Sequence, residues 1–393
     1  MANVSSSNGL ENRPKLRFPG FDEPYKQCRI GDIYAERSQR GASNMELLSV
    51  TMNDGVMPRS EIEGKDNSSE DKSSYKIVHK GDMVYNSMRM WQGANGISPC
   101  DGIVSPAYTV LMPKQEINNG YFAALFKNSN LINEFRKNSQ GMTSDTWNLK
   151  YPQIETIKVQ IPSISEQNKV SEIFRILDER IAAQSQLIDT LKKYKRGVIK
   201  AILSKQICFA DDRGNYYTEW SECTLQEAVD FLDGQRKPLE SADRAKRQGK
   251  YPYYGASGII DYIDGYIFDE PLLLLGEDGA NIINRSSPLC FIATGKFWVN
   301  NHAHVMRPRM GQNIKFLCEL LESLDYTRYN TGTAQPKLNQ EKCRQIVLHL
   351  PTYEEQCHIA DFLSAVEQKH IHEQKELDSL IKIKTALLQQ LFI

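Results

Sequence analysis

The residues of this 393-residue chain that could do catalytic chemistry lack the partners that such chemistry needs. A base-flipping DNA methyltransferase holds its target with an Asp/Asn-Pro-Pro-aromatic motif, and the sequence has no Asn-Pro or Asp-Pro dipeptide. A P-loop needs GxxxxGK[ST], but the Gly-Lys pairs at 64, 249 and 295 lack both the earlier glycine and the hydroxyl residue. Gly276 and Gly279, after a leucine run, favour a tight turn over a cofactor loop.

Metal and nuclease candidates are isolated in the same way. His302 and His304 would share a strand face, but they have no Cys or acidic partner in a recognisable zinc-ligand pattern. Four more residues also lack a standard ligand spacing: Cys343, His349, Cys357 and His358. Glu367-Gln368-Lys369 has an ExK spacing, yet it lies in an expected surface helix where such charge pairs are ordinary. We predict no metal, no cofactor and no catalytic residue in this chain.

Composition limits the remaining classes. Lys plus Arg total 48 against 49 Asp plus Glu, so nucleic-acid contacts must come from local basic patches rather than an overall excess. The longest purely aliphatic run is 272–275, far short of the roughly 20 apolar residues of a membrane helix. A polar N-terminus and eight cysteines without a CxxC predict a reduced, cytoplasmic protein.

The elements that must position any functional residue are revealed by an internal repeat. A shift of 189 residues brings several residue pairs into register: Ile161-Pro162 with Leu350-Pro351, Glu166-Gln167 with Glu355-Gln356, Asp189 with Asp378, Lys193 with Lys382 and Lys195 with Lys384. A weaker echo, at an offset of 195, relates Cys28 to Cys223. Residues 31–140 and 226–331 show little similarity, so each half has a variable body followed by a constant tail.

The constant tails have the apolar period of long helices. Apolar residues step by threes and fours from Val170 to Ile202 and again from Ile359 to Leu391. A rod with one apolar stripe needs a partner of similar length, and the chain supplies only the other tail. A pseudo-two-fold then pairs the tails as an antiparallel coiled coil, with the bodies expected at its opposite ends. Gln184 and Glu373 on this seam could set register or reach a wet rim.

The variable bodies read as α+β domains of related topology. Short strands are expected near 81–86, 103–104 and 108–111 in the first body. The second body offers strands at 266–268, 272–275, 289–292 and 296–299. Helices are expected at 121–137 and 314–324.

This tandem layout resembles the specificity (S) subunit of type I restriction-modification systems. Five segments are also similar to that family: Leu16-Arg-Phe-Pro-Gly-Phe21, 90–98, 276–281, 297–304 and 332–339. The resemblance covers nearly the whole chain after residue 15. The repeat and the resemblance divide the chain into an N-terminal tail, recognition domain 1, helical region 1, a linker, recognition domain 2 and helical region 2: 1–24, 25–160, 161–205, 206–219, 220–348 and 349–393.

The resemblance implies a non-catalytic reader of double-stranded DNA with a bipartite target, one half-site for each recognition domain. It implies that the helices dock two modification subunits, which carry S-adenosylmethionine and methylate adenine. Two restriction subunits, which use ATP and Mg, would join for cleavage. No cofactor is expected in this subunit, and no membrane is involved. The alternative is a coiled-coil scaffold or adaptor that binds proteins and no DNA.

Base-reading residues are expected on loops that a rigid sheet holds in place. The side-chain types expected there are Arg or Lys for guanine, Asn or Gln for adenine, and Asp or Glu for the amino group of cytosine. The candidates in recognition domain 1 are Asn86, Arg89, Trp91, Gln92, Asn95, Ser144, Asp145 and Asn148. The candidates in recognition domain 2 are Gln235, Arg236, Lys237, Glu277, Asp278, Asn281, Asn300, Asn301, His302, Gln335 and Lys337. Each of them could instead be a solvated loop residue.

Phosphate contacts are expected from basic side chains, most densely in 236–250. These residues are Arg37, Arg40, Arg236, Lys237, Arg244, Lys246, Arg247 and Lys250. A charged surface without a partner is the alternative.

Overall fold

The computed structural model describes residues 13–40, 44–66, 68–211, 213–217, 219–332 and 335–393. Residues 1–12 of the expected tail, and 333–334 of the segment 332–339, lie outside the described residues. The chain forms two compact units, Met1–Gln186 with Lys375–Ile393 (unit 1) and Leu187–Gln374 (unit 2). Each unit therefore contains one recognition domain and part of both long helices.

The described residues of unit 1 form two four-stranded sheets and a two-stranded ribbon. Its strands are β1 (Lys26–Arg29), β2 (Tyr34–Glu36), β3 (Leu47–Val50), β4 (Val56–Pro58), β5 (Lys76–Val78), β6 (Met83–Asn86), β7 (Asn95–Ile97), β8 (Gly102–Val104), β9 (Tyr108–Pro113) and β10 (Lys158–Ile161). Its helices are α1 (Ile30–Ile33), η2 (Arg59–Glu61), η3 (Met90–Gln92), α2 (Asn119–Leu125), α3 (Ser129–Asn138), α4 (Tyr151–Ile154) and the first part of α5 (Ile164–Leu203).

Unit 2 has the same order of strands as unit 1 but a partly different set of short helices. Its strands are β11 (Ser221–Thr224), β12 (Val229–Phe231), β13 (Gln248–Gly255), β14 (Gly258–Ile263), β15 (Phe268–Asp269), β16 (Leu272–Gly276), β17 (Cys290–Ala293), β18 (Lys296–Val299), β19 (Ala303–Pro308) and β20 (Val347–Leu350). Its helices are α6 (Leu225–Ala228), η4 (Asp233–Gln235), α7 (Ser241–Lys246), α8 (Asn281–Asn284), α9 (Ile314–Ser323), η5 (Thr327–Tyr329), α10 (Gln340–Arg344) and the first part of α11 (Tyr353–Gln390).

The sheets confirm the duplication strand by strand. The antiparallel sheet β2-β9-β6-β7 of unit 1 corresponds to β12-β19-β16-β17 of unit 2. The second sheet, β4-β3-β8-β5, corresponds to β14-β13-β18-β15, and each contains one parallel pair, β3–β8 and β13–β18. The ribbons β1–β10 and β11–β20 pair Lys26 with Ile161 and Ser221 with Leu350. The prediction of two related α+β domains is therefore confirmed.

The central strand of each unit is buried on both faces. Side chains alternate along a strand, so Leu273 and Leu275 enter one hydrophobic core while Leu272 and Leu274 enter another. The unit 1 counterpart β6 behaves in the same way. The loop that follows this strand is thus held by a rigid sheet, which suits a loop that must present side chains.

The glutamine of the repeated Glu-Gln pair fastens each recognition domain to its long helix. Gln167 accepts a hydrogen bond from the amide of Asn118, the residue that caps α2, at 3.1 Å. Gln356 accepts the same bond from Asn313, the cap of α9, at 2.9 Å. Both glutamines are buried. The sequence repeat at these positions therefore marks the same joint in both units.

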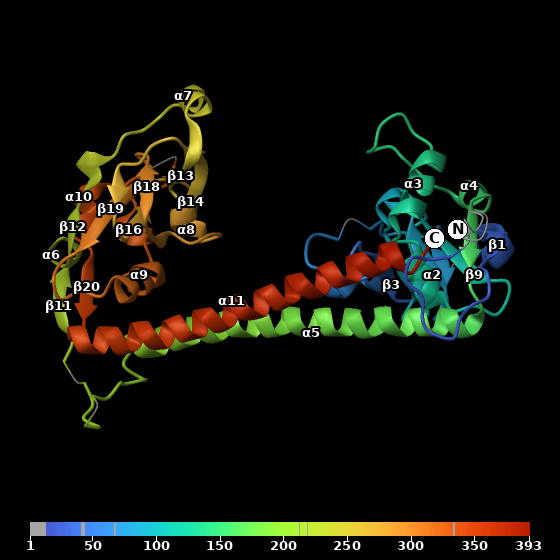
Figure 1. The fold of residues 1–393 in the computed structure, drawn as a ribbon, viewed down its shortest axis with the longest axis horizontal. Coiled ribbons are helices and arrows are strands. Elements are labelled where there is room, and N and C mark those ends of the chain that lie inside the picture. The colour runs from blue at the N-terminus through green and yellow to red at the C-terminus, as the bar shows by residue number, and fades with distance from the viewer. Residues whose placement is uncertain (1–12, 41–43, 67, 212, 218, 333–334) are drawn as a thin grey trace, which may run out of the picture. The chain divides into compact units, whose positions relative to one another are not determined.

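The long helices pair in antiparallel fashion, as predicted (Figure 1). In unit 1, Phe174 of α5 stacks on Phe392 just beyond α11, and Arg180 of α5 binds Glu376 of α11 at 2.8 Å. In unit 2, Lys195 of α5 binds Glu367 of α11 at 2.9 Å. Two polar residues of the seam are buried rather than at a wet rim: Gln184 is 9% exposed and Glu373 4%.

One predicted helix is wrong in extent. Residues 121–137 form two helices, α2 and α3, instead of one. The break occurs because the side chain of Asn128 accepts a hydrogen bond from the amide of Asn130 at 2.9 Å and so starts a new helix.

Candidate nucleic-acid interface

Two loops of recognition domain 1 meet beyond the end of β6. The carbonyl of Ser87 accepts a hydrogen bond from the amide of Leu149 at 2.8 Å, which ties the loop after β6 to the loop that precedes α4. The rings of Trp91 and Trp147 meet edge to face at 5.2 Å, and Arg136 lies 5.1 Å above Trp147. Two loops far apart in sequence thus share one aromatic anchor.

The candidates of this domain divide into exposed and inward-turned side chains. Arg89, Ser144 and Asp145 are exposed, and the guanidinium of Arg89 has no hydrogen bond within the described part of the chain. Asn86 instead accepts a hydrogen bond from the amide of Met88 at 3.0 Å. Arg89 is therefore the best placed of these side chains to reach a base edge.

Four further candidates are half-buried or buried. Asn95 is 1% exposed and donates to the carbonyl of Gly93 at 2.9 Å, so its amide is not offered to solvent. Trp91 is half-buried against Trp147, and Gln92 buries its side-chain oxygen without a hydrogen-bond partner among the described residues. Asn148 pairs through its backbone with Gln140 and closes the loop that carries Ser144.

Arg40 belongs to a different part of the domain. It is exposed and forms an isolated bridge with Lys76 at the start of β5, in the second sheet. Arg37, the other basic residue here, is held by Asp82 at 2.7 Å. Arg40 therefore keeps its charge available, whereas the charge of Arg37 is already compensated.

Recognition domain 2 gathers most of its candidates around Glu277, at the end of β16. The carboxylate of Glu277 accepts a hydrogen bond from Arg236 at 2.8 Å and lies 3.4 Å from the ammonium of Lys337. Its backbone amide binds the carbonyl of His302, and its carbonyl accepts from Leu338 at 2.7 Å. Four loops, those after η4, after β16, before β19 and before α10, therefore meet at this one residue.

A buried pair lies beneath Glu277. Nδ1 of His304 is 2.7 Å from a carboxylate oxygen of Asp233, and Nε2 is 2.7 Å from the carbonyl oxygen of Leu338. Asp233 also accepts from Gln340 at 2.7 Å and from the amide of Val305 at 2.8 Å. Burial is the largest single influence on the pKa of Asp233 and raises it. Interactions with His304, the amide of Val305 and the charge of Arg236 together outweigh burial, so the pKa of Asp233 is lowered.

His304 joins three segments of the domain. A carbonyl can only accept a hydrogen bond, so Nε2 of His304 donates to Leu338. Nδ1 shares a hydrogen bond with Asp233, so the ring connects η4, β19 and the segment before α10.

The other candidates of domain 2 again separate by exposure. The exposed ones are Gln235, Lys237, Asn301, His302, Gln335 and Lys337. Asp278 is half-buried and meets Nδ1 of His302 at 2.8 Å. The side chain of Asn281 folds back on its own loop and accepts a hydrogen bond from the amide of Ser287. Asn300 is buried, and its side-chain oxygen accepts a hydrogen bond from the amide of His302.

Arg236 has a structural position. Besides Glu277, its guanidinium donates to the carbonyls of Asp233 and Ala303 at 3.0 and 2.8 Å. Through these hydrogen bonds the side chain of Arg236 holds the loops together, so its guanidinium is not free to reach a base or a phosphate.

The basic segment 236–250 has fewer available charges than its composition indicates. Arg244 is bound to Asp261, and Arg247 is bound to Asp264 while lying over Trp298. The ammonium groups of three residues have no ion pair within the described chain: Lys237, Lys246 and Lys250.

Sequence reasoning missed the supports of these loops. Trp147, Asp233 and Gln340 were not candidates, and His304 was considered only as a possible metal ligand. A signal existed for Trp147, an aromatic residue within the polar segment 144–148. None existed for Asp233 and His304, which are 71 positions apart. Among the described residues, no group of three or more His, Cys, Asp or Glu side chains could hold a metal ion.

The family model for the type I restriction modification DNA specificity domain matches residues 23–193 and again 217–382. The chain belongs to this family. Such specificity subunits are generally non-catalytic. Each match contains one recognition domain and most of the long helix that follows it, so the two matches reproduce the repeat seen in the sheets.

Relatives support the assignment to the specificity family. A specificity subunit of Haemophilus influenzae is 34% identical over 148 residues, which span 38% of this chain and 37% of that relative. The MjaVIII specificity subunit of Methanocaldococcus jannaschii is 24% identical over 354 residues, or 80% of this chain and 79% of the relative. The crystal structure of the S subunit from M. genitalium has the same fold, with a TM-score of 0.61 at 17% identity over 97% of this chain and 99% of that one.

The described helices of this specificity protein include none that is both long enough and apolar enough to span a bilayer. The long helices α5 and α11 carry charged residues throughout their length.

Proposed function

We propose that this chain reads a bipartite double-stranded DNA sequence, with each recognition domain contacting one half-site. The observation that carries the proposal is the duplicated architecture. The same strand order supports a loop at the end of β6 in one unit and of β16 in the other, yet the side chains on these loops differ. A shared scaffold with different loops suits two readers of two different short sequences.

The exposed side chains supply chemistry for base edges. Arg89 in domain 1 can donate two hydrogen bonds to guanine, and Gln335 in domain 2 can pair with adenine. The half-buried Asp278 can accept from the amino group of cytosine, whereas the carboxylate of Glu277 is held by Arg236 and Lys337. Asn95, Asn281, Asn300 and Arg236 are not assigned to DNA contacts, because their side chains form hydrogen bonds inside the protein.

Phosphate contacts are assigned to the basic side chains that have no internal ion pair. These are Arg40, Lys237, Lys246 and Lys250. Such contacts fix register and add a salt-dependent affinity without reading sequence.

The long helices are proposed to dock two modification subunits. Tyr194 of α5 and Ile383 of α11 are 51% and 49% exposed, and the 189-residue repeat places them at equivalent positions. Exposed apolar side chains on paired helices suit a protein partner. One solved structure with the same fold, with a TM-score of 0.58, carries a title on complex assembly of the type I R-M system.

The chemistry is proposed to lie in the partners. The modification subunits would bring S-adenosylmethionine, and two restriction subunits would bring ATP and Mg, while this chain contributes no cofactor and no catalytic residue. We place the complex in the cytoplasm, where chromosomal DNA is accessible.

Methylome sequencing tests the function. A host that expresses this chain with its modification subunit should carry methylated adenine in one bipartite motif, and deletion of the chain should abolish that methylation. Arg89→Ala and Gln335→Ala should each relax a different half of the motif. A uniform, salt-dependent loss would mark these two residues as phosphate contacts. Unchanged methylation without the chain would favour the adaptor alternative.

A further inference from the structure

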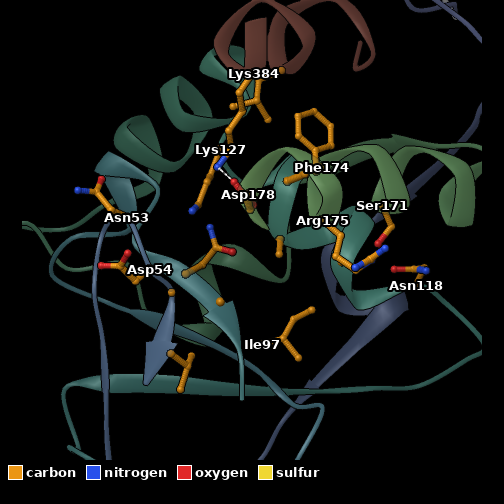
Figure 2. A pocket seen from close by; sticks show the side chains of 18 residues that line it. Asn53, Asp54, Ile97, Asn118, Lys127, Ser171, Phe174, Arg175, Asp178 and Lys384 are labelled. Atoms are coloured by element: carbon orange, nitrogen blue, oxygen red, sulfur yellow. Dashed lines mark hydrogen bonds and ion pairs between the residues drawn. The ribbon is translucent and has the colours of Figure 1, made fainter. Parts of the chain in front are cut away.

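A pocket of about 390 Å³ opens in unit 1 between recognition domain 1 and the paired helices (Figure 2). Its walls come from the turn before β4, from β7 and α2, and from α5 and α11. Apolar side chains such as Ile97 and Phe174 line most of it. Figure 2 shows Lys127, Asp178 and Lys384 close together at one side of the pocket.

Unit 2 contains the equivalent pocket, which serves as an internal reference. The helix caps Asn118 and Asn313 align α2 with α9 at an offset of 195, and the helix repeat aligns Lys384 with Lys195. The unit 2 pocket measures about 180 Å³. Two carboxylates that line it, Glu319 and Glu367, hold the ammonium of Lys195 between them at 2.7 and 2.9 Å.

Unit 1 lacks one of these carboxylates. Asp178 occupies the position of Glu367 and binds Lys384, but Ala124 stands where unit 2 has Glu319. The position of Glu322, whose carboxylate caps two backbone amides in unit 2, is taken by Lys127. At these two positions unit 1 thus has two fewer negative charges and one more positive charge than unit 2, and its pocket is larger.

Lys127 is the unusual group. Its ammonium has no hydrogen bond or ion pair among the described residues. Burial, and then the charge of Lys384, lower its pKa, while Asp178 and Asp54 oppose this change. Arg175 on the rim is already bound to Glu172 and Glu179. The charge of Lys127 is thus incompletely compensated within the protein.

We propose that this pocket binds a carboxylate carried on a small apolar body. The carboxylate takes the place that Glu319 fills in unit 2, between Lys384 and Lys127, and the apolar body lies against Ile97 and Phe174. The volume is within the usual range for small-ligand sites. The ligand is either a free organic acid or an acidic side chain of a partner subunit, and both present the same group.

Fluorine NMR on the full-length chain tests the proposal without DNA. The probe is 4-fluorophenylacetate, and the neutral control is 4-fluorophenylacetamide. The acid should bind and the amide should bind at least tenfold more weakly. Equal binding of acid and amide, or no binding at millimolar concentration, would overturn the proposal.

Two variants locate the binding. Lys127→Gln should weaken binding of the acid about tenfold, whereas the matched change Lys315→Gln at the unit 2 pocket should leave that affinity unchanged. Ala124→Glu installs the missing carboxylate, so it should abolish acid binding and raise Tm by about 2–4 °C. If Ala124→Glu misfolds, the Lys127→Gln result alone decides, and an unaltered affinity in that variant contradicts the site.

The assembled complex identifies the source of the carboxylate. If a partner side chain occupies the pocket, adding the modification subunit should displace the probe. If the ligand is a free acid, the probe should bind the assembled complex as well as the isolated chain. Either result supports the site, since both require binding to the isolated chain.

Discussion

At the residue scale, two nearby histidines of recognition domain 2 have opposite surroundings. His304 is 0% exposed and forms hydrogen bonds through both nitrogens, whereas His302 is exposed beside Asp278. We predict that His304→Ala lowers the free energy of unfolding by about 2–4 kcal/mol, because Asp233 and the carbonyl of Leu338 lose a hydrogen-bond partner and remain buried. Chemical denaturation of the full chain, followed through the tryptophans, measures this loss.

His302→Ala is the matched control. Its side chain is half in solvent, so its removal should cost less than about 1 kcal/mol. The two variants should differ in DNA reading too, since His304 acts only by holding the loops. Equal destabilisation by both changes would show that the buried pair contributes no more than a surface contact.

Also at the residue scale, the repeat places two buried glutamates, Glu166 and Glu355, at equivalent positions near the starts of α5 and α11, but their partners differ. Glu166 receives two hydrogen bonds from Arg17, at 2.9 and 2.8 Å. Glu355 has no arginine, and its Oε2 lacks a hydrogen-bond partner within the described chain. Burial raises the pKa of Glu355 above its ordinary value of 4.5.

Removing these two charges should therefore have opposite effects on stability. Glu166→Gln should cost about 2–4 kcal/mol at neutral pH, because Arg17 is left without its partner. Glu355→Gln should raise Tm, because ionised Glu355 is disfavoured by burial. On acidification, Glu355 becomes protonated at a higher pH in the folded chain than in the unfolded chain. The stability advantage of Glu355→Gln should therefore shrink as the pH falls through the raised pKa. Thermal unfolding at pH 8 and pH 5 checks the sign, and an advantage that grows on acidification would contradict it.

At the scale of elements, the helix pair offers two equivalent docking positions. Tyr194→Asp and Ile383→Asp lie on exposed surface, so neither should change Tm by more than about 2 °C. Each should remove one of the two modification subunits, and the double variant should remove both, because a charge would be buried in the contact. Native mass spectrometry of the complex counts the subunits.

Ile383→Leu is the control for this experiment, since it keeps an apolar side chain of the same size. Full assembly of the double aspartate variant would show that the partners dock elsewhere.

Sequence patterns were sufficient for the elements but insufficient for the loops. The repeat of Glu166-Gln167 and the apolar period of the tails are local signals, and they predicted the paired helices and the duplicated domains. Asn95 and Asn301 look alike in sequence, yet one is buried and the other exposed. The difference depends on which backbone groups each loop leaves unpaired, and that is decided by contacts between distant segments.

At the scale of the whole molecule, duplication predicts that the two readers can be exchanged separately. Replacing residues 220–339 with the segment of a relative should change one half of the methylated motif and leave the other half and the spacer length unchanged. The segment includes β11 but not β20, so the graft must rebuild the β11–β20 ribbon. That ribbon pairs through backbone groups, which tolerate a change of side chains. Methylome sequencing of the chimera reads out both halves in one experiment, and a change in both would mean that the two domains share their contacts with DNA.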